Sequence, residues 1–121
     1  MAGSSMGGLI STYAACVYPQ VFRKIASVSS AYWFNQAEIE ALIQESDLSA
    51  VDRFYMDVGT NEVTSTIDSE AYIRSSTAVY GLLQPKIERL HFAIAPGAEH
   101  NEAAWRRRLP EIFGFLYGEL L

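Results

Sequence analysis

The apolar residues of the chain alternate between two spacings, which predicts an alternation of helices and strands. Apolar side chains recur every three or four positions over residues 9–17, 37–44 and 68–83, as on one face of an α-helix. Short runs that favour strands occupy residues 24–29, 53–58 and 89–95, and a last helix begins near residue 102 and kinks or restarts at Pro110. Strands that alternate with helices of this length indicate an α/β fold with a mainly parallel sheet covered by helices.

The ends of the predicted strands carry the polar residues from which a site could be built. In an open parallel sheet, ligands bind at the carboxyl ends of the strands. Here those ends hold Ser29 and Ser30, the sequence GTNE at residues 59–62, and the sequence GAEH at residues 97–100.

Composition and charge exclude several classes of protein. The chain has 121 residues, enough for a single domain, and 50% of them are hydrophobic and 19% charged, so disorder is not expected. The net charge of −5 disfavours nucleic acid and anionic membranes as partners, and we interpret the basic run at residues 106–108 as a solvated helix face. No apolar stretch approaches the roughly 20 residues that span a membrane, which favours a cytoplasmic protein.

The only cysteine, Cys16, lies in a helix-like run. One cysteine excludes a disulfide within the chain and a cysteine-based zinc cluster. We expect a buried structural thiol at this position.

The first residues of the chain fit a motif of nucleophilic catalysis. The stretch is too polar and too short for a signal peptide, and its sequence GSSMG, at residues 3–7, matches G-x-S-x-G. In that motif a serine sits on a tight turn between a strand and a helix. Glycines two positions before and after it avoid collisions, and the helix N-terminus lies beside it. The alternative is a loop that is merely rich in glycine and serine.

A general base and an acid follow in the order that such a site requires. The chain has two histidines. His91 lies inside a predicted strand and is expected to be packed, whereas His100 lies in the loop after it, where a hydrolase of this topology carries its base. Glu62 directly follows the preceding strand and is the leading candidate for the acid. The rivals are Asp57, which suits a structural hydrogen bond within its strand, and Asp68, which suits a helix N-cap.

Four stretches in this order resemble the α/β-hydrolase esterases of the esterase D and enterochelin-esterase-like type. They are AGSSMGG, SVSSAYWF, DVGTNE and GAEHNEAAW. The resemblance implies a serine nucleophile at Ser5, a general base at His100 and the acid at Glu62, where relatives commonly have aspartate. It implies an oxyanion donor in the backbone N–H of Met6. It also implies an aromatic wall for substrate at Tyr32 and Trp33, for which packing is the alternative role.

The resemblance further implies a function and an extent. The chain would cleave small-molecule carboxylic esters through an acyl-enzyme, without a metal or an organic cofactor. Residues 1–121 would form one domain, the C-terminal portion of an α/β-hydrolase domain that starts at the serine turn. Such a three-stranded remnant would expose a sheet edge and favour a homo-oligomer or another association through that edge. The alternative function is a catalytically impaired portion that acts only through association.

Overall fold

The fold is a parallel sheet with helices on both faces. The computed structural model describes residues 1–118. Its four strands lie in the order β1 (Ala2–Ser4), β2 (Lys24–Val28), β3 (Arg53–Asn61) and β4 (Leu90–Glu99), and every neighbouring pair is parallel. The α/β fold predicted from the sequence is therefore confirmed. The expected count of three strands was wrong, because residues 2–4 pair with residues 26–28 and form a fourth.

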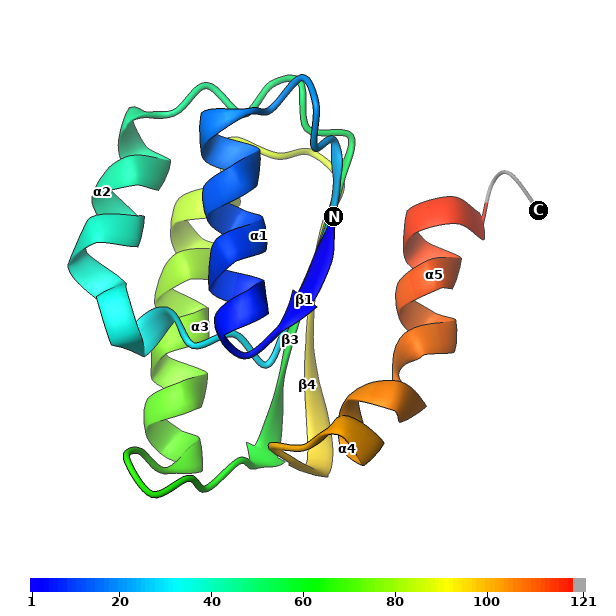
Figure 1. Cartoon of the computed structure of the whole chain (residues 1–121). Coiled ribbons are helices and arrows are strands. Elements are labelled where there is room, and N and C mark those ends of the chain that lie inside the picture. The colour runs from blue at the N-terminus through cyan, green and yellow to red at the C-terminus, as the bar shows by residue number, and fades with distance from the viewer. Residues whose placement is uncertain (119–121) are drawn as a thin grey trace.

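The helices divide unequally between the two faces (Figure 1). One face carries α1 (Met6–Val17), the short helix η1 (Tyr32–Asn35), α2 (Gln36–Glu45) and α3 (Ser69–Leu83). The other face carries α4 (Glu102–Arg107) and α5 (Leu109–Tyr117), which run one after the other. The break between them falls at Arg108, with Pro110 in the first turn of α5, where the missing N–H of proline costs no hydrogen bond. None of the helices over residues 1–118 is long and apolar enough to cross a membrane.

Alternate residues of β3 feed two separate apolar cores, as the two-residue period of a strand requires. Phe54 and Met56 belong to the larger core, under α1, α2 and α3. Tyr55 points to the opposite face, where it packs with Ile112 and Leu116 of α5. Cys16 is a buried member of the larger core, as expected, and burial raises the pKa of its thiol.

The turn from β1 into α1 is tight, and its backbone is strained at Ser5. Ser5 has φ 56° and ψ −118°, a backbone conformation that a residue with a Cβ rarely adopts. Its N–H donates to the carbonyl of Val28 at 2.9 Å, and its own carbonyl accepts from the N–H of Ala31 at 3.0 Å. The N–H of Ser5 is thus fixed to the last residue of β2, and its carbonyl is fixed to the segment that follows β2.

The glycines around this turn differ in how much room they have. A Cβ on Gly3 would overlap the backbone of Gly7, so the close approach at this position requires glycine. A Cβ on Gly7 would meet nothing within 4 Å, whereas one on Gly8 would lie 2.8 Å from the Cβ of Ser30. The expectation that the second motif glycine avoids a collision was therefore wrong, because the crowded position is the next residue, which faces the sheet.

This difference predicts opposite results for two Gly→Ala variants. Gly3→Ala should lower the free energy of unfolding by about 1–3 kcal/mol or more, because the backbones must separate. Gly7→Ala should leave it unchanged or raise it by up to about 1 kcal/mol, because glycine is a poor helix former. Urea unfolding followed by far-ultraviolet circular dichroism measures both, and equal midpoints for the two variants would contradict the close approach at Gly3.

Candidate active site

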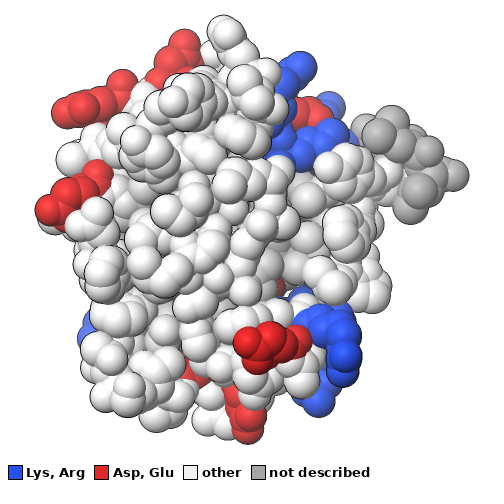
Figure 2. Space-filling model, in the orientation of Figure 1, with Lys and Arg blue, Asp and Glu red and all other residues white. Residues whose placement is uncertain are grey.

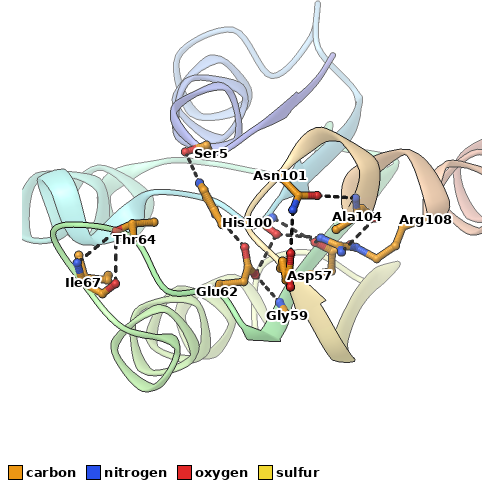
Figure 3. A network of polar contacts seen from close by, with 12 residues as sticks. Ser5, Asp57, Gly59, Glu62, Thr64, Ile67, His100, Asn101, Ala104 and Arg108 are labelled. Atoms are coloured by element: carbon orange, nitrogen blue, oxygen red, sulfur yellow. Dashed lines mark hydrogen bonds and ion pairs between the residues drawn. The ribbon is translucent and has the colours of Figure 1, made fainter.

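Three polar side chains from three strand ends meet at one edge of the sheet. Ser5 follows β1, Glu62 follows β3 and His100 follows β4. The Nε2 atom of His100 lies 2.9 Å from Oγ of Ser5, and its Nδ1 atom lies 2.8 Å from Oε1 of Glu62 (Figure 3). Parallel strands end at the same edge, so residues 95 positions apart come into hydrogen-bond contact. The structure thus brings together the serine, histidine and glutamate named from the sequence.

Ser5 lies at the N-terminus of α1, with Met6 as the first helical residue. The first N–H groups of a helix have no acceptor within the helix, and this end of the helix dipole is positive. Negative charge that develops beside Ser5 would therefore be stabilised by the backbone at Met6. The side chain of Met6 is exposed.

Glu62 is fully buried and both of its carboxylate oxygens have partners. Oε1 faces His100, while Oε2 accepts from the hydroxyl of Ser29 at 2.9 Å and from the N–H of Gly59. These donors stabilise a carboxylate that has lost its hydration.

The two rival carboxylates take the structural roles that their positions suggested. Asp57 accepts from the N–H of Ser29 and binds Arg108. Asp68 caps α3 by accepting from the N–H of Ala71 at 2.9 Å. Neither of them hydrogen-bonds to His100, so Glu62 is the carboxylate paired with the imidazole.

Aromatic rings enclose the imidazole of His100, whose side chain is 12% exposed. The ring of Tyr72 lies 4.9 Å from it between centroids, and Trp105 meets it edge-on at 5.1 Å. Burial raises the pKa of the Tyr72 phenol, so this neighbour is uncharged at neutral pH. Trp105 is the last residue of the stretch GAEHNEAAW that carries the resemblance, whereas no motif included Tyr72, whose place in α3 resembles that of any other buried helix residue.

The predicted aromatic wall is only partly present. Tyr32 is fully buried in the larger core, and its hydroxyl bonds to Thr12 and Ser27 at 2.8 and 2.7 Å. The contacts observed for Tyr32 are those of the packing alternative, and its contact with substrate stays a prediction. Trp33 is half-buried and meets Tyr72 edge-on at 6.2 Å, one ring removed from His100.

The basic run at residues 106–108 also needs a correction. Arg106 and Arg107 are exposed as expected, but Arg108 is buried and points to the sheet, four residues after the buried Ala104. Its Nε and Nη2 atoms donate to the carboxylate of Asp57 at 2.7 and 3.1 Å. Nη2 also donates to Oγ of Ser29 at 2.8 Å.

His91, the second histidine, packs far from this chemistry. Its ring lies between those of Tyr55 and Phe115, at 5.6 and 5.5 Å between centroids. Its side chain is 43% exposed and lies 3.5 Å from Glu111, so it is packed as expected but not enclosed.

Two hollows open near the site. A polar one of about 280 Å³ lies beside His100 and is lined also by Asn61, Val63, Glu99 and Asn101. An apolar cleft of about 480 Å³ runs between β1 and the helices α4 and α5. Within residues 1–118, no three histidine, cysteine, aspartate or glutamate side chains are grouped so that they could hold a metal ion.

Comparison with known proteins relates this arrangement to esterases. The YbbA protein of Bacillus subtilis (strain 168), named as uncharacterized, is 30% identical over 123 residues, which cover 98% of this chain and 49% of YbbA. The enterobactin esterase FES from Shigella flexneri has a similar fold, with a TM-score of 0.82 and 24% identity over 99% of this chain and 31% of FES. A ferulic acid esterase matches with a TM-score of 0.72 and 16% identity over 95% of this chain and 49% of its own.

The chain thus spans half or less of the length of these relatives. The structural matches show a shared fold, and the family is shown by sequence. The family described as Putative esterase matches residues 1–116, nearly the whole chain. The chain belongs to this esterase family.

Proposed function

We propose that the chain is a serine hydrolase of carboxylic esters, with Ser5 as nucleophile, His100 as general base and Glu62 as the acid that orients the base. The observation that carries the proposal is a continuous chain of hydrogen bonds: Oγ of Ser5 lies 2.9 Å from Nε2 of His100, and Nδ1 of His100 lies 2.8 Å from Oε1 of Glu62. The strained serine at a helix N-terminus supports it, because such strain persists where a reactive group must be presented. Family membership supports the same reaction class.

The reaction follows from the direction of these contacts. As Oγ of Ser5 attacks the ester carbonyl, Nε2 of His100 takes its proton, and the carbonyl electron pair moves to oxygen. The tetrahedral intermediate then expels the alcohol, which receives that proton from His100. In the second half, His100 takes a proton from water, which attacks the acyl carbon; the bond to Oγ of Ser5 then breaks, Oγ receives that proton from His100, and the acid is released. The nucleophile and the base are both side chains, so these steps require no cofactor.

Glu62 and Met6 stabilise the charges that form during this cycle. The Glu62 carboxylate accepts Nδ1–H, which leaves Nε2 free to receive the Ser5 proton and stabilises the imidazolium that results. The backbone N–H of Met6, directly after the nucleophile, donates to the oxyanion. One such donor is typically worth about 10²–10³ in turnover.

A second candidate function is association with another copy of the chain, and specific exposed residues favour it. The α1 stripe consists of exposed apolar residues with helical spacing: Met6, Ile10, Tyr13 and Val17. The α5 stripe consists of Leu109, Phe113 and Tyr117. Figure 2 shows that the face over α1 and β1 is nearly free of charge, with charged side chains gathered at its rim.

The strand β1 lies at the end of the sheet order, so within the described residues its outer edge has no partner strand. A twofold axis normal to the sheet at that edge would place β1 antiparallel to its copy. It would also bring α1 next to its copy on one face, whereas α5, which packs over β2 and β3, would stay set back from the axis on the other face. Such pairing would cover an open edge and apolar surface that a monomer leaves exposed.

The hydrolase proposal predicts covalent labelling at one serine. A fluorophosphonate should add a single adduct to Ser5, detected by intact mass and located by peptide mapping, because Ser5 is the one serine within residues 1–118 that hydrogen-bonds to His100. Ser5→Ala should abolish the adduct and reduce hydrolysis of p-nitrophenyl acetate to background. Ser4→Ala, which removes the neighbouring hydroxyl, should keep both. Labelling of Ser4, or none in a folded sample, would overturn the assignment.

The role of Glu62 predicts a large loss in the variant Glu62→Gln. The amide keeps the volume but removes the charge that stabilises the imidazolium, so kcat should fall on the order of 10⁴-fold with p-nitrophenyl acetate. Asp68→Asn is the matched control, because asparagine also caps a helix and the residue lies outside the site. Equal losses in the two variants, or none in Glu62→Gln, would contradict the assignment of the acid.

The association candidate predicts a concentration-dependent mass in sedimentation velocity. The wild-type chain should shift from monomer toward dimer as its concentration rises through the micromolar range, and Ile10→Glu should prevent the shift by placing charge in the α1 stripe. Val21→Glu is the control, because Val21 is 71% exposed but lies outside both stripes. A monomer at every concentration would contradict this candidate.

A further inference from the structure

Ser29 occupies an unusual position directly after β2. It is fully buried and has φ 45°, the second non-glycine residue at positive φ besides Ser5 within residues 1–118. Its N–H donates to the side chain and to the carbonyl of Asp57, at 3.0 and 3.1 Å. A buried serine in a strained conformation persists only where its surroundings hold it there, and such residues cluster at functional sites.

The hydroxyl of Ser29 has a defined direction because of its two partners. Nη2 of Arg108 lies 2.8 Å from Oγ, and a guanidinium can only donate, so Oγ is the acceptor in this contact. The single proton of the hydroxyl then goes to Oε2 of Glu62, at 2.9 Å, since a carboxylate accepts. The donation therefore runs one way, from Arg108 through Ser29 to Glu62.

The start of this chain of hydrogen bonds is itself fixed. Arg108 holds both carboxylate oxygens of Asp57, through Nε at 2.7 Å and Nη2 at 3.1 Å. The hydroxyl of Tyr55 donates to Oδ2 of Asp57 at 2.6 Å. Burial raises the pKa of the Tyr55 phenol, which keeps that proton available as a donor. Figure 3 shows Arg108 and Asp57 beside Glu62 and His100.

We propose that Ser29 is a positioning residue of the site: its hydroxyl, oriented by Arg108, holds Oε2 of Glu62 so that Oε1 faces Nδ1 of His100. Without this donor, Oε2 keeps only the N–H of Gly59, so two hydrogen bonds, from Gly59 and His100, hold the carboxylate in place of three. The catalytic meaning of the inference rests on the proposed ester hydrolysis, but the effect on His100 can be measured without it.

Two variants of Ser29 separate the hydroxyl from the backbone. Ser29→Ala and Ser29→Gly both remove the hydroxyl, but alanine keeps the strain at φ 45° and glycine relieves it. Both should lower kcat by roughly 10–100-fold with little change in KM, the loss expected for one hydrogen bond to a charged group. Their urea midpoints should differ, with Ser29→Gly the more stable. Ser76→Ala, which removes a buried hydroxyl that has no hydrogen-bond partner among the described residues, should match the wild type.

The tautomer of His100 provides a readout that does not depend on activity. In the ¹⁵N-labelled chain at alkaline pH, the ring nitrogen shifts of His100 should indicate the Nδ1–H form in the wild type and a mixture in both Ser29 variants. His91, the other histidine of the chain, is an internal reference and should not change.

The outcomes of the two measurements distinguish the two proposals. A shifted tautomer in a chain that neither labels nor hydrolyses esters would overturn the hydrolase and keep the positioning role. An unchanged tautomer in both variants would overturn the positioning role whatever the activity does. Loss of activity in Ser29→Ala with full activity in Ser29→Gly would also overturn it, because the effect would then come from the backbone.

Discussion

The ion pair between Asp57 and Arg108 connects the sheet to the C-terminal helices α4 and α5. Asp57 belongs to β3 and Arg108 lies between α4 and α5, and both side chains are buried. A buried pair of this kind adds little net stability, but removing one partner typically costs about 3–5 kcal/mol, because the other charge is left without compensation. The pair therefore fixes where the C-terminal helices sit on the sheet. His100 and Trp105 lie in the segment that it anchors.

His100 reaches the acid because the sheet becomes irregular where β4 ends. Gly59 pairs with Ala95 and Asn61 with Glu99, so two steps along β3 oppose four steps along β4, as at a bulge in β4. A bulge redirects the side chains that follow it, and His100 is the residue directly after β4. On β3, the N–H of Gly59 donates to Glu62, and the closeness of Gly59 to the Ala98 carbonyl leaves no room for a side chain there. Glutamate is one methylene longer than aspartate, and in this geometry its carboxylate contacts Gly59, Ser29 and His100.

The sequence predicted those parts of the molecule that follow from spacing and order. Period and length located the helices and the three longer strands, and the rule that sites lie at strand ends brought Ser5, Glu62 and His100 to one edge. The burial of Arg108 was not predicted, because α4 spans only Glu102–Arg107 and is too short for a periodic pattern to show which arginine faces the sheet. The role of Ser29 was not predicted, because its positive φ accompanies contacts with Asp57 that the sequence does not reveal. Serine is not a residue type whose presence indicates a positive φ.

The site and the exposed surface depend on different parts of the chain. Every hydrogen bond that positions Glu62 and His100 is made among residues 5–108, at the carboxyl ends of the strands. The α1 stripe lies beside the open edge of β1, the α5 stripe lies on the helix that packs over β2 and β3, and nothing within residues 1–118 covers either stripe. A change in the stripes should therefore alter association while the geometry of the site persists. A change at Ser29 should alter the geometry of the site and leave association unchanged, because its contacts with Glu62 and Arg108 lie wholly in the interior.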